Sequence, residues 1–132
     1  MAKTDAALLR GLKRLTKGLQ FQSESDYAVE PFAPDAGRAA SAADVVKSLR
    51  GDAEARAVDF DNFFAAATEE QDWQDAEARA RVKKFQALVK YLKENLNDLQ
   101  VFKVGDTEAD VYVVGRAASG NFAGVKTKVV ET

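Results

Sequence analysis

The amino-acid sequence predicts an α+β fold in which helices pack against a mainly antiparallel sheet. Three segments rich in β-branched and aromatic residues close the chain, at 101–104, 111–114 and 124–130. Their spacing is typical of an antiparallel meander. Segments with helical spacing precede these strands, and together the two patterns indicate an α+β sandwich.

The N-terminal part of the sequence predicts one helix and one short strand. Leucines at intervals of three and four residues predict an amphipathic helix over about 4–17, with Thr4 as its N-cap. The SESD stretch at 23–26 is expected to be an exposed turn. A short strand follows at 29–32, and Pro31 should confine it to a sheet edge because proline lacks a backbone N–H.

The middle of the sequence predicts two short helices. One is expected over 42–49, with Ser41 as its N-cap and a glycine as its stop. A strand near 56–58 then leads to a second helix, capped by Asp59 or Asp61, whose phenylalanines should be core residues. The DFDN run lacks the glycine and the distal glutamate of a calcium loop, which excludes that kind of site.

The longest helix is predicted after these elements. The TEEQ run at 68–71 matches a capping box, which predicts that a helix begins at Thr68. Apolar residues with helical spacing then predict the main helix at about 75–95. Trp73 lies where this helix is entered, and two interpretations stay open: a core or staple residue, or an exposed interface anchor.

The charges are distributed unevenly along the chain, although the net charge is only -2. Residues 1–20 carry five basic and one acidic side chain, residues 21–75 carry four and thirteen, and residues 76–132 carry ten and seven. The acidic middle segment should repel nucleic acid and attract cationic protein surfaces. For the basic outer face of the first helix, a solvated surface is favoured over a weak nucleic-acid patch.

Composition argues for binding rather than catalysis. The 132 residues are 46% hydrophobic, which fits a single domain over 1–132 with its own core. The sequence has no cysteine and no histidine, so the usual nucleophile, general base and zinc ligands are absent. We therefore expect a protein that is not an enzyme and needs no cofactor. We also expect it to be soluble and cytoplasmic, because no apolar run is long enough for a membrane span.

The sequence predicts a strand that continues almost to the last residue. Apolar or β-branched side chains alternate with others from Val125 to Val129. The hydroxyl of Thr132 and its terminal carboxylate could close a chelate ring of roughly six atoms around a hard cation such as Mg2+. The alternative is that the chain simply stops there.

Several stretches carry a resemblance to a known family. They are LQFQSESDY, VDFDNFF, QDW, VKKFQALV, DVYVVG, GNFAG and the terminal TKVVET, and they extend over 19–132. In order and spacing they resemble the nuclease A inhibitor, or NuiA-like, proteins, which inhibit sugar-nonspecific nucleases. The resemblance implies an α-β-α sandwich similar to pathogenesis-related protein 1. It also implies that the chain occludes the active site of a ββα-metal DNA/RNA endonuclease.

The resemblance also implies which residues meet the nuclease. Thr132 would reach the catalytic Mg2+ of the target, so it is a metal ligand only in the complex. Glu24 of the SES motif would meet basic or polar groups at the rim of the cleft. Glu131 would add negative charge beside the metal.

A second contact loop is implied by the QDW motif, which falls on Gln71, Asp72 and Trp73. The expected partner is a nonspecific metal-dependent nuclease, with no direct contact to nucleic acid, no membrane, and a monomer when free. The alternative function is an interaction or regulatory protein of the same fold with a non-nuclease partner. An enzyme using paired carboxylates or a Ser and Lys pair is disfavoured, because no nucleophile motif is present.

Overall fold

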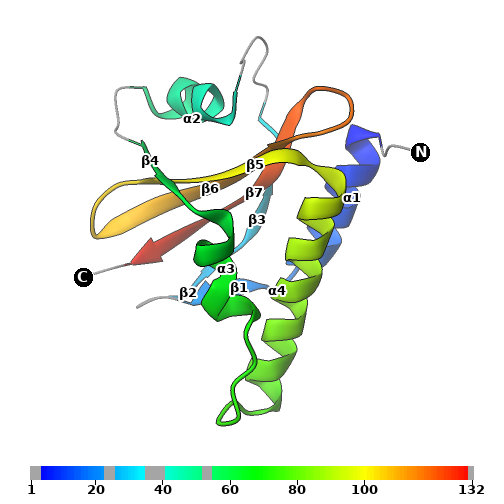
Figure 1. Ribbon diagram of the computed structural model, residues 1–132, viewed down its shortest axis with the longest axis vertical. Coiled ribbons are helices and arrows are strands. Elements are labelled where there is room, and N and C mark those ends of the chain that lie inside the picture. Colours follow the sequence, from blue (N-terminus) through cyan, green and yellow to red (C-terminus); the bar gives the residue numbers. More distant parts are fainter. Residues whose placement is uncertain (1–3, 23–25, 35–40, 52–54, 131–132) are drawn as a thin grey trace.

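The computed structural model describes residues 4–22, 26–34, 41–51 and 55–130 (Figure 1). In this part of the chain five antiparallel strands form the main sheet, in the order β3-β7-β6-β5-β4. The strands are β3 (Glu30–Phe32), β4 (Ala55–Val58), β5 (Asn97–Val104), β6 (Glu108–Arg116) and β7 (Phe122–Val130). The predicted α+β fold with a mainly antiparallel sheet is therefore confirmed.

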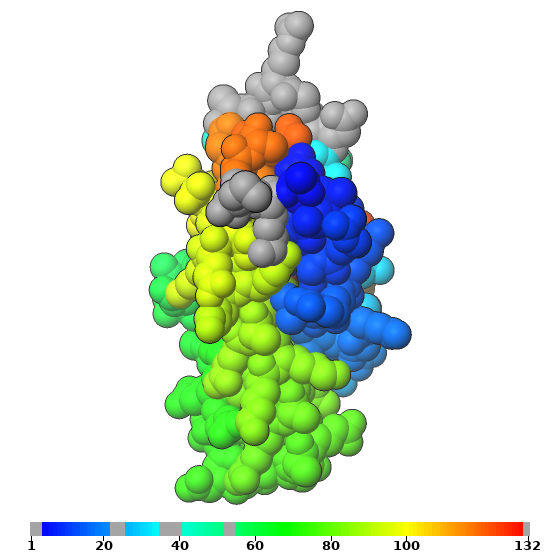
Figure 2. Space-filling model, turned by 90° about the vertical axis from the view of Figure 1, so that its right-hand side faces the viewer, coloured from blue at the N-terminus to red at the C-terminus, as the bar shows by residue number. Residues whose placement is uncertain are grey.

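Helices lie on both faces of this sheet, as Figure 1 shows. They are α1 (Asp5–Thr16), α2 (Ala42–Arg50), α3 (Phe60–Thr68) and α4 (Ala76–Asn95). Leu12 of α1 and Phe85 of α4 pack in one core with Val113 of the sheet. Val45 of α2 packs in a second core with Tyr112, on the opposite sheet face. The space-filling view in Figure 2 shows α1 and α4 side by side on the outside of the first layer.

The helix starts follow from local capping chemistry. In all four described helices the N-cap side chain accepts a hydrogen bond from the backbone N–H three residues on, at 2.8–3.2 Å. The caps are Thr4, Ser41, Asp59 and Asp75. The predictions of Thr4 and Ser41 are confirmed, and of the two aspartates considered for α3, Asp59 is the cap.

The predicted helix start at Thr68 is wrong. Thr68 is the last residue of α3, and its hydroxyl donates to the carbonyls of Phe64 at 2.9 Å and Ala65 at 3.3 Å. A hydroxyl bonded backward into its own helix is not available to cap a new one. The next helix begins at Ala76, close to the predicted position of the main helix.

A separate two-stranded hairpin lies beside the main sheet. It pairs β1 (Gln20–Gln22) with β2 (Asp26–Ala28), and the sequence predicts neither strand. Residues 23–25, which include Glu24, lie outside the described residues. Strand β3 follows β2 and occupies the sheet edge, as Pro31 predicts. None of the described helices has the length and apolar character to cross a membrane.

Candidate functional site

Strand β7 leads toward Thr132, the residue predicted to bind a metal ion. It pairs with β6 along its whole length, from Arg116↔Phe122 to Glu108↔Val130, and with β3 on its other side. Val125 and Val129 are almost completely buried beneath the helices. The prediction of a strand that continues close to the C-terminus is thus confirmed as far as Val130. Glu131 and Thr132 lie outside the described residues.

The second half of β7 is tied to β2 by side-chain contacts. The Thr127 hydroxyl lies 3.0 Å from the carbonyl oxygen of Ala28 and 3.4 Å from that of Tyr27. The Lys128 ammonium lies 5.7 Å from the centroid of the Tyr27 ring, within cation-π range. Because β2 begins at Asp26, two residues after Glu24 in the sequence, the structure places the strand that follows Glu24 beside the strand that leads toward Thr132.

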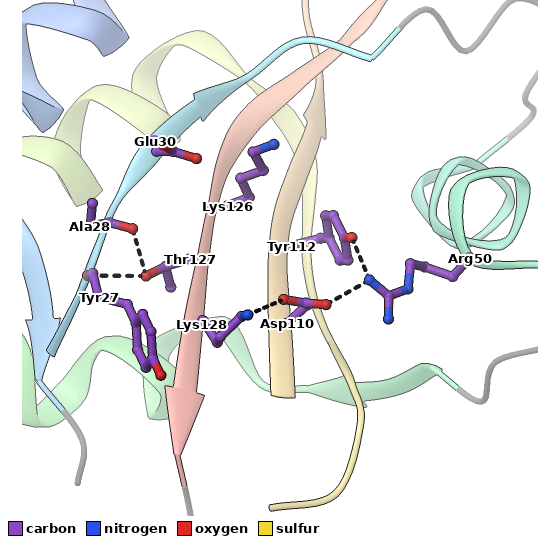
Figure 3. Close-up of a pocket in the computed structure, with 9 residues that line it drawn as sticks. All are labelled: Tyr27, Ala28, Glu30, Arg50, Asp110, Tyr112, Lys126, Thr127 and Lys128. Carbon is purple, nitrogen blue, oxygen red and sulfur yellow. Dashed lines mark hydrogen bonds and ion pairs between the residues drawn. The ribbon is translucent and has the colours of Figure 1, made fainter. Parts of the chain in front are cut away.

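Lys128 is also held by two carboxylates of β6. Its Nζ lies 2.9 Å from Glu108 and 3.9 Å from Asp110, and Figure 3 shows it between Asp110 and Tyr27. The hydrogen bond and charge of Glu108, followed by the charge of Asp110, raise the pKa of Lys128 above its ordinary value. The cation is thereby kept in one place close to the end of β7.

Asp110 connects this strand network to α2. Arg50 at the end of α2 donates a hydrogen bond to Asp110 at 2.6 Å and another to the Tyr112 hydroxyl at 3.4 Å. These two hydrogen bonds, the one to Tyr112 first, raise the pKa of Arg50. A single carboxylate therefore links a helix and a strand that are far apart in the sequence.

An open hollow of about 350 Å3 lies over these residues, on the face of the sheet that α2 partly covers (Figure 3). Glu30 and Lys126 face each other across β3 and β7 on its other side. Sequence reasoning missed this hollow. The alternation of Lys126 and Lys128 on one side of a strand was a signal for it, but the arrival of Arg50 from α2 had no local signal.

The QDW loop joins α3 to α4 and is fixed by its own hydrogen bonds. The backbone N–H of Gln71 donates to the side chain of Gln74 at 2.9 Å, and the N–H of Gln74 returns to the Gln71 carbonyl at 3.1 Å. Arg79 of α4 donates to the carbonyl oxygen of Asp72 at 3.2 Å. Trp73 projects from this closed loop with 81% of its surface exposed. The core or staple interpretation of Trp73 is therefore wrong.

A hollow of about 320 Å3 is lined by residues of both the hairpin and the QDW loop. Phe21 of β1 lines it with Trp73, Gln71 and Phe85. The Phe21 ring stacks on Phe63 of α3, with centroids 4.7 Å apart and planes 6° apart. The base of the hairpin is thus packed on the same two helices that hold the loop. Figure 1 shows the hairpin next to the end of β7, and the loop at the lower tip of the molecule.

The stretch between the end of α3 and the first turn of α4 is acidic. Between the end of α3 and the first turn of α4 the sequence carries five carboxylates and no basic residue, namely Glu69, Glu70, Asp72, Asp75 and Glu77. All five are exposed. An exposed indole with carboxylates on both sides in the sequence suits a cationic protein surface. Within the described ranges, no group of three or more carboxylates is arranged to hold a metal ion.

Two comparisons with known proteins bear on this site. The family described as nuclease A inhibitor-like protein matches residues 6–132, which is nearly the whole chain. A comparison with curated proteins gives no match.

Proposed function

Because the chain belongs to the nuclease A inhibitor-like family, we propose that it inhibits a sugar-nonspecific ββα-metal endonuclease by occluding its active site. Membership implies a nuclease inhibitor in general; the nuclease class and the mode of inhibition are the proposal. The observation that carries it is the pairing of β7 with β6 as far as Val130, two residues before Thr132. We further propose one inhibitor domain over 1–132, with a sandwich similar to pathogenesis-related protein 1.

In the proposed complex, Thr132 supplies oxygen ligands to the catalytic Mg2+ of the nuclease. Mg2+ prefers oxygen donors, and a hydroxyl with a carboxylate on one residue resembles the phosphate and water oxygens of a substrate complex. Glu131 adds negative charge beside the metal. The metal belongs to the nuclease, so no cofactor is proposed for the inhibitor itself.

The other contacts come from the neighbouring segments. We propose that Glu24 contacts basic or polar groups at the rim of the nuclease cleft. We propose a second set of contacts for Gln71, Asp72 and Trp73. Two observations support the second assignment: Trp73 is exposed and the loop that holds it is internally hydrogen-bonded. Hot spots of this kind are commonly exposed aromatic anchors on a rigid support.

Preorganisation explains how a small surface would bind tightly. Ordering a flexible chain end on binding costs conformational entropy, and a strand already paired with β6 as far as Val130 avoids part of that cost. The exposed carboxylates at 69–77 flank Trp73 in the sequence and would accelerate association with a cationic cleft. That acceleration should fall with added salt, since exposed charges are screened.

A titration of the nuclease tests this function. A Mg2+-dependent nonspecific nuclease is titrated with the native protein, with a form extended by a few residues after Thr132, and with a form extended at Met1 as the matched control. The native and N-terminally extended forms should inhibit stoichiometrically, whereas the C-terminally extended form should not. Equal potency of all three would refute the chelation mechanism.

Failure of the native protein against every such nuclease would refute the inhibitor function. The alternative, an interaction or regulatory protein with a non-nuclease partner, would then be the better account. No catalytic role is proposed, and a cytoplasmic location stays a prediction from the sequence.

A further inference from the structure

The outer face of the α1 and α4 layer carries cations that the sequence alone could not bring together. Figures 1 and 2 show the two helices side by side, and the Tyr91 hydroxyl of α4 lies 3.4 Å from the Leu8 carbonyl of α1. An open hollow of about 420 Å3 lies along this junction. Arg10 and Arg14 of α1 line it together with Tyr91.

Two lysines extend this basic surface. Lys17, the C-cap residue of α1, lies three residues after Arg14, and residues at this spacing are neighbours on a helix surface. Lys84 lies seven residues before Tyr91, which is two helical turns, so it shares with Tyr91 the side of α4 that faces α1. All four cations are exposed. None of them makes a side-chain ion pair or hydrogen bond within the part of the chain that the structure describes.

Two carboxylates of α1 and α4 have other partners. Asp5 of α1 accepts hydrogen bonds from Ser119 and Asn121, both at 2.7 Å. Glu94 of α4 lies 3.9 Å from Lys90. Among the described residues, no carboxylate forms an ion pair with the four cations of the α1 and α4 face, in contrast to the paired charges of the hollow over β7.

We propose that this face, defined by Arg10, Arg14, Lys17 and Lys84, binds the phosphate backbone of nucleic acid. Arginine guanidinium groups match phosphate oxygens in a forked geometry, and rows of unpaired cations on neighbouring helices suit a repeating polyanion. An anionic membrane suits the face less well, because interfacial helices insert exposed apolar side chains. The large exposed apolar residues of the described chain are Leu49 and Trp73, and neither lies on α1 or α4.

This proposal goes beyond nuclease inhibition and does not depend on it. Helices α1 and α4 lie at the right of Figure 1, whereas the end of β7 lies at the left. Nucleic acid and a protein partner at the end of β7 would thus not compete for the same surface. The expectation of no direct nucleic-acid contact accompanied the family resemblance and the acidic middle segment, and a solvated surface was favoured for the first helix. The sequence could not show that α4, which carries Lys84, packs beside α1.

Fluorescence anisotropy of a labelled thymidine oligonucleotide with the purified full chain, without nuclease, tests the proposal. Replacing both arginines, Arg10→Gln with Arg14→Gln, should weaken binding at low salt by at least about fivefold. It should also reduce the slope of log K against log salt by about 1.4, the value for two lost phosphate contacts on a single strand. A second variant, Lys17→Gln with Lys84→Gln, should weaken binding and reduce the salt slope to a similar extent.

The matched control removes two charges from the opposite face, by Lys47→Gln on α2 with Lys126→Gln on β7. It should change the affinity less than about twofold, although its net charge equals that of the arginine variant. The proposal is overturned if the wild-type chain does not bind the oligonucleotide at low salt, or if the control loses as much affinity as the arginine variant. Binding to phosphatidylserine vesicles but not to the oligonucleotide would overturn it in favour of a membrane surface.

Discussion

The Thr127 hydroxyl of β7 donates a hydrogen bond to the carbonyl of Ala28 in β2, at 3.0 Å. This bond joins residues 99 positions apart, and it fixes the hairpin against the last strand of the sheet. Two segments to which the inhibitor family resemblance assigns nuclease contacts therefore start from one connected support. The affinity of a partner that contacts both segments at once should therefore depend on this bond.

Replacement of Thr127 by valine should weaken inhibition, because valine keeps the branched shape but cannot donate to Ala28. A loss of about 1 kcal/mol is expected in the free energy of unfolding, and roughly fivefold in the inhibition constant. Urea unfolding and nuclease titration measure the two effects. Thr107→Val, in the exposed β5–β6 turn, is the matched control and should change neither. An unchanged inhibition constant in Thr127→Val would show that the hairpin and β7 act independently.

Trp73→Ala should separate binding from stability. Because 81% of the Trp73 surface is exposed, the melting temperature should stay nearly unchanged. The affinity for the nuclease should fall by about 1 to 3 kcal/mol if Trp73 is an interface anchor. Leu49→Ala removes a second large exposed apolar side chain of the described residues, on α2, and serves as the control for both readouts. A large drop in melting temperature for Trp73→Ala would contradict the structure.

Gly124→Ala should destabilise the fold itself. Gly124 lies in β7, and a Cβ atom there would collide with the backbone of Val113 in β6. Backbone in the middle of a sheet cannot move aside cheaply, so a loss of about 2 kcal/mol or more is expected in urea unfolding. Ala118→Val adds a larger group in an exposed turn and should have little effect. Wild-type stability in Gly124→Ala would mean that β6 and β7 are less closely packed than described.

Asp5 provides a pH-dependent contact. Hydrogen bonds from Asn121, then Ser119, lower the pKa of Asp5 below its ordinary value of 3.8. The stabilisation from the charged form is therefore present above pH 3.8 and is lost as the pH falls through the lowered pKa. Asn121→Ala should raise the pKa of Asp5, as measured by NMR titration of its carboxyl group.

The stability difference between the wild type and Asn121→Ala should accordingly shrink below pH 3.8. Asn62→Ala, on α3, is the control and should leave the titration of Asp5 unchanged. A stability difference that grows on acidification would reverse the assigned sign and contradict the contact.

Features with local causes could be predicted from the sequence. The caps at Thr4 and Ser41 and the strands of the meander depend on residues within a few positions of one another. Thr68 shows the limit of local patterns, because one hydroxyl can serve a helix on either side and the sequence does not say which. The short strands of the hairpin were missed because three residues are too few for a periodic signal.

The candidate site was only partly predictable for the same reason. That Trp73 is exposed depends on where α3 and α4 place their connecting loop, which is a tertiary property. The contact between Arg50 and Asp110 spans 60 positions, and nothing near either residue indicates the other. The resemblance to the inhibitor family supplied candidate contact residues, but not the packing that connects them.

The place of β7 in the sheet also bears on how the protein folds. Strand β7 follows every other strand in the sequence, yet it lies between β3 and β6 rather than at an edge. Pro31 of β3 pairs with Val125, so this part of the sheet needs residues separated by most of the chain. Such distant pairings form slowly, since a long loop must close before any contact stabilises it. The sheet can therefore be completed only after residues 122–130 have left the ribosome, and until then β3 and β6 expose unpaired edges to chaperones and to other chains.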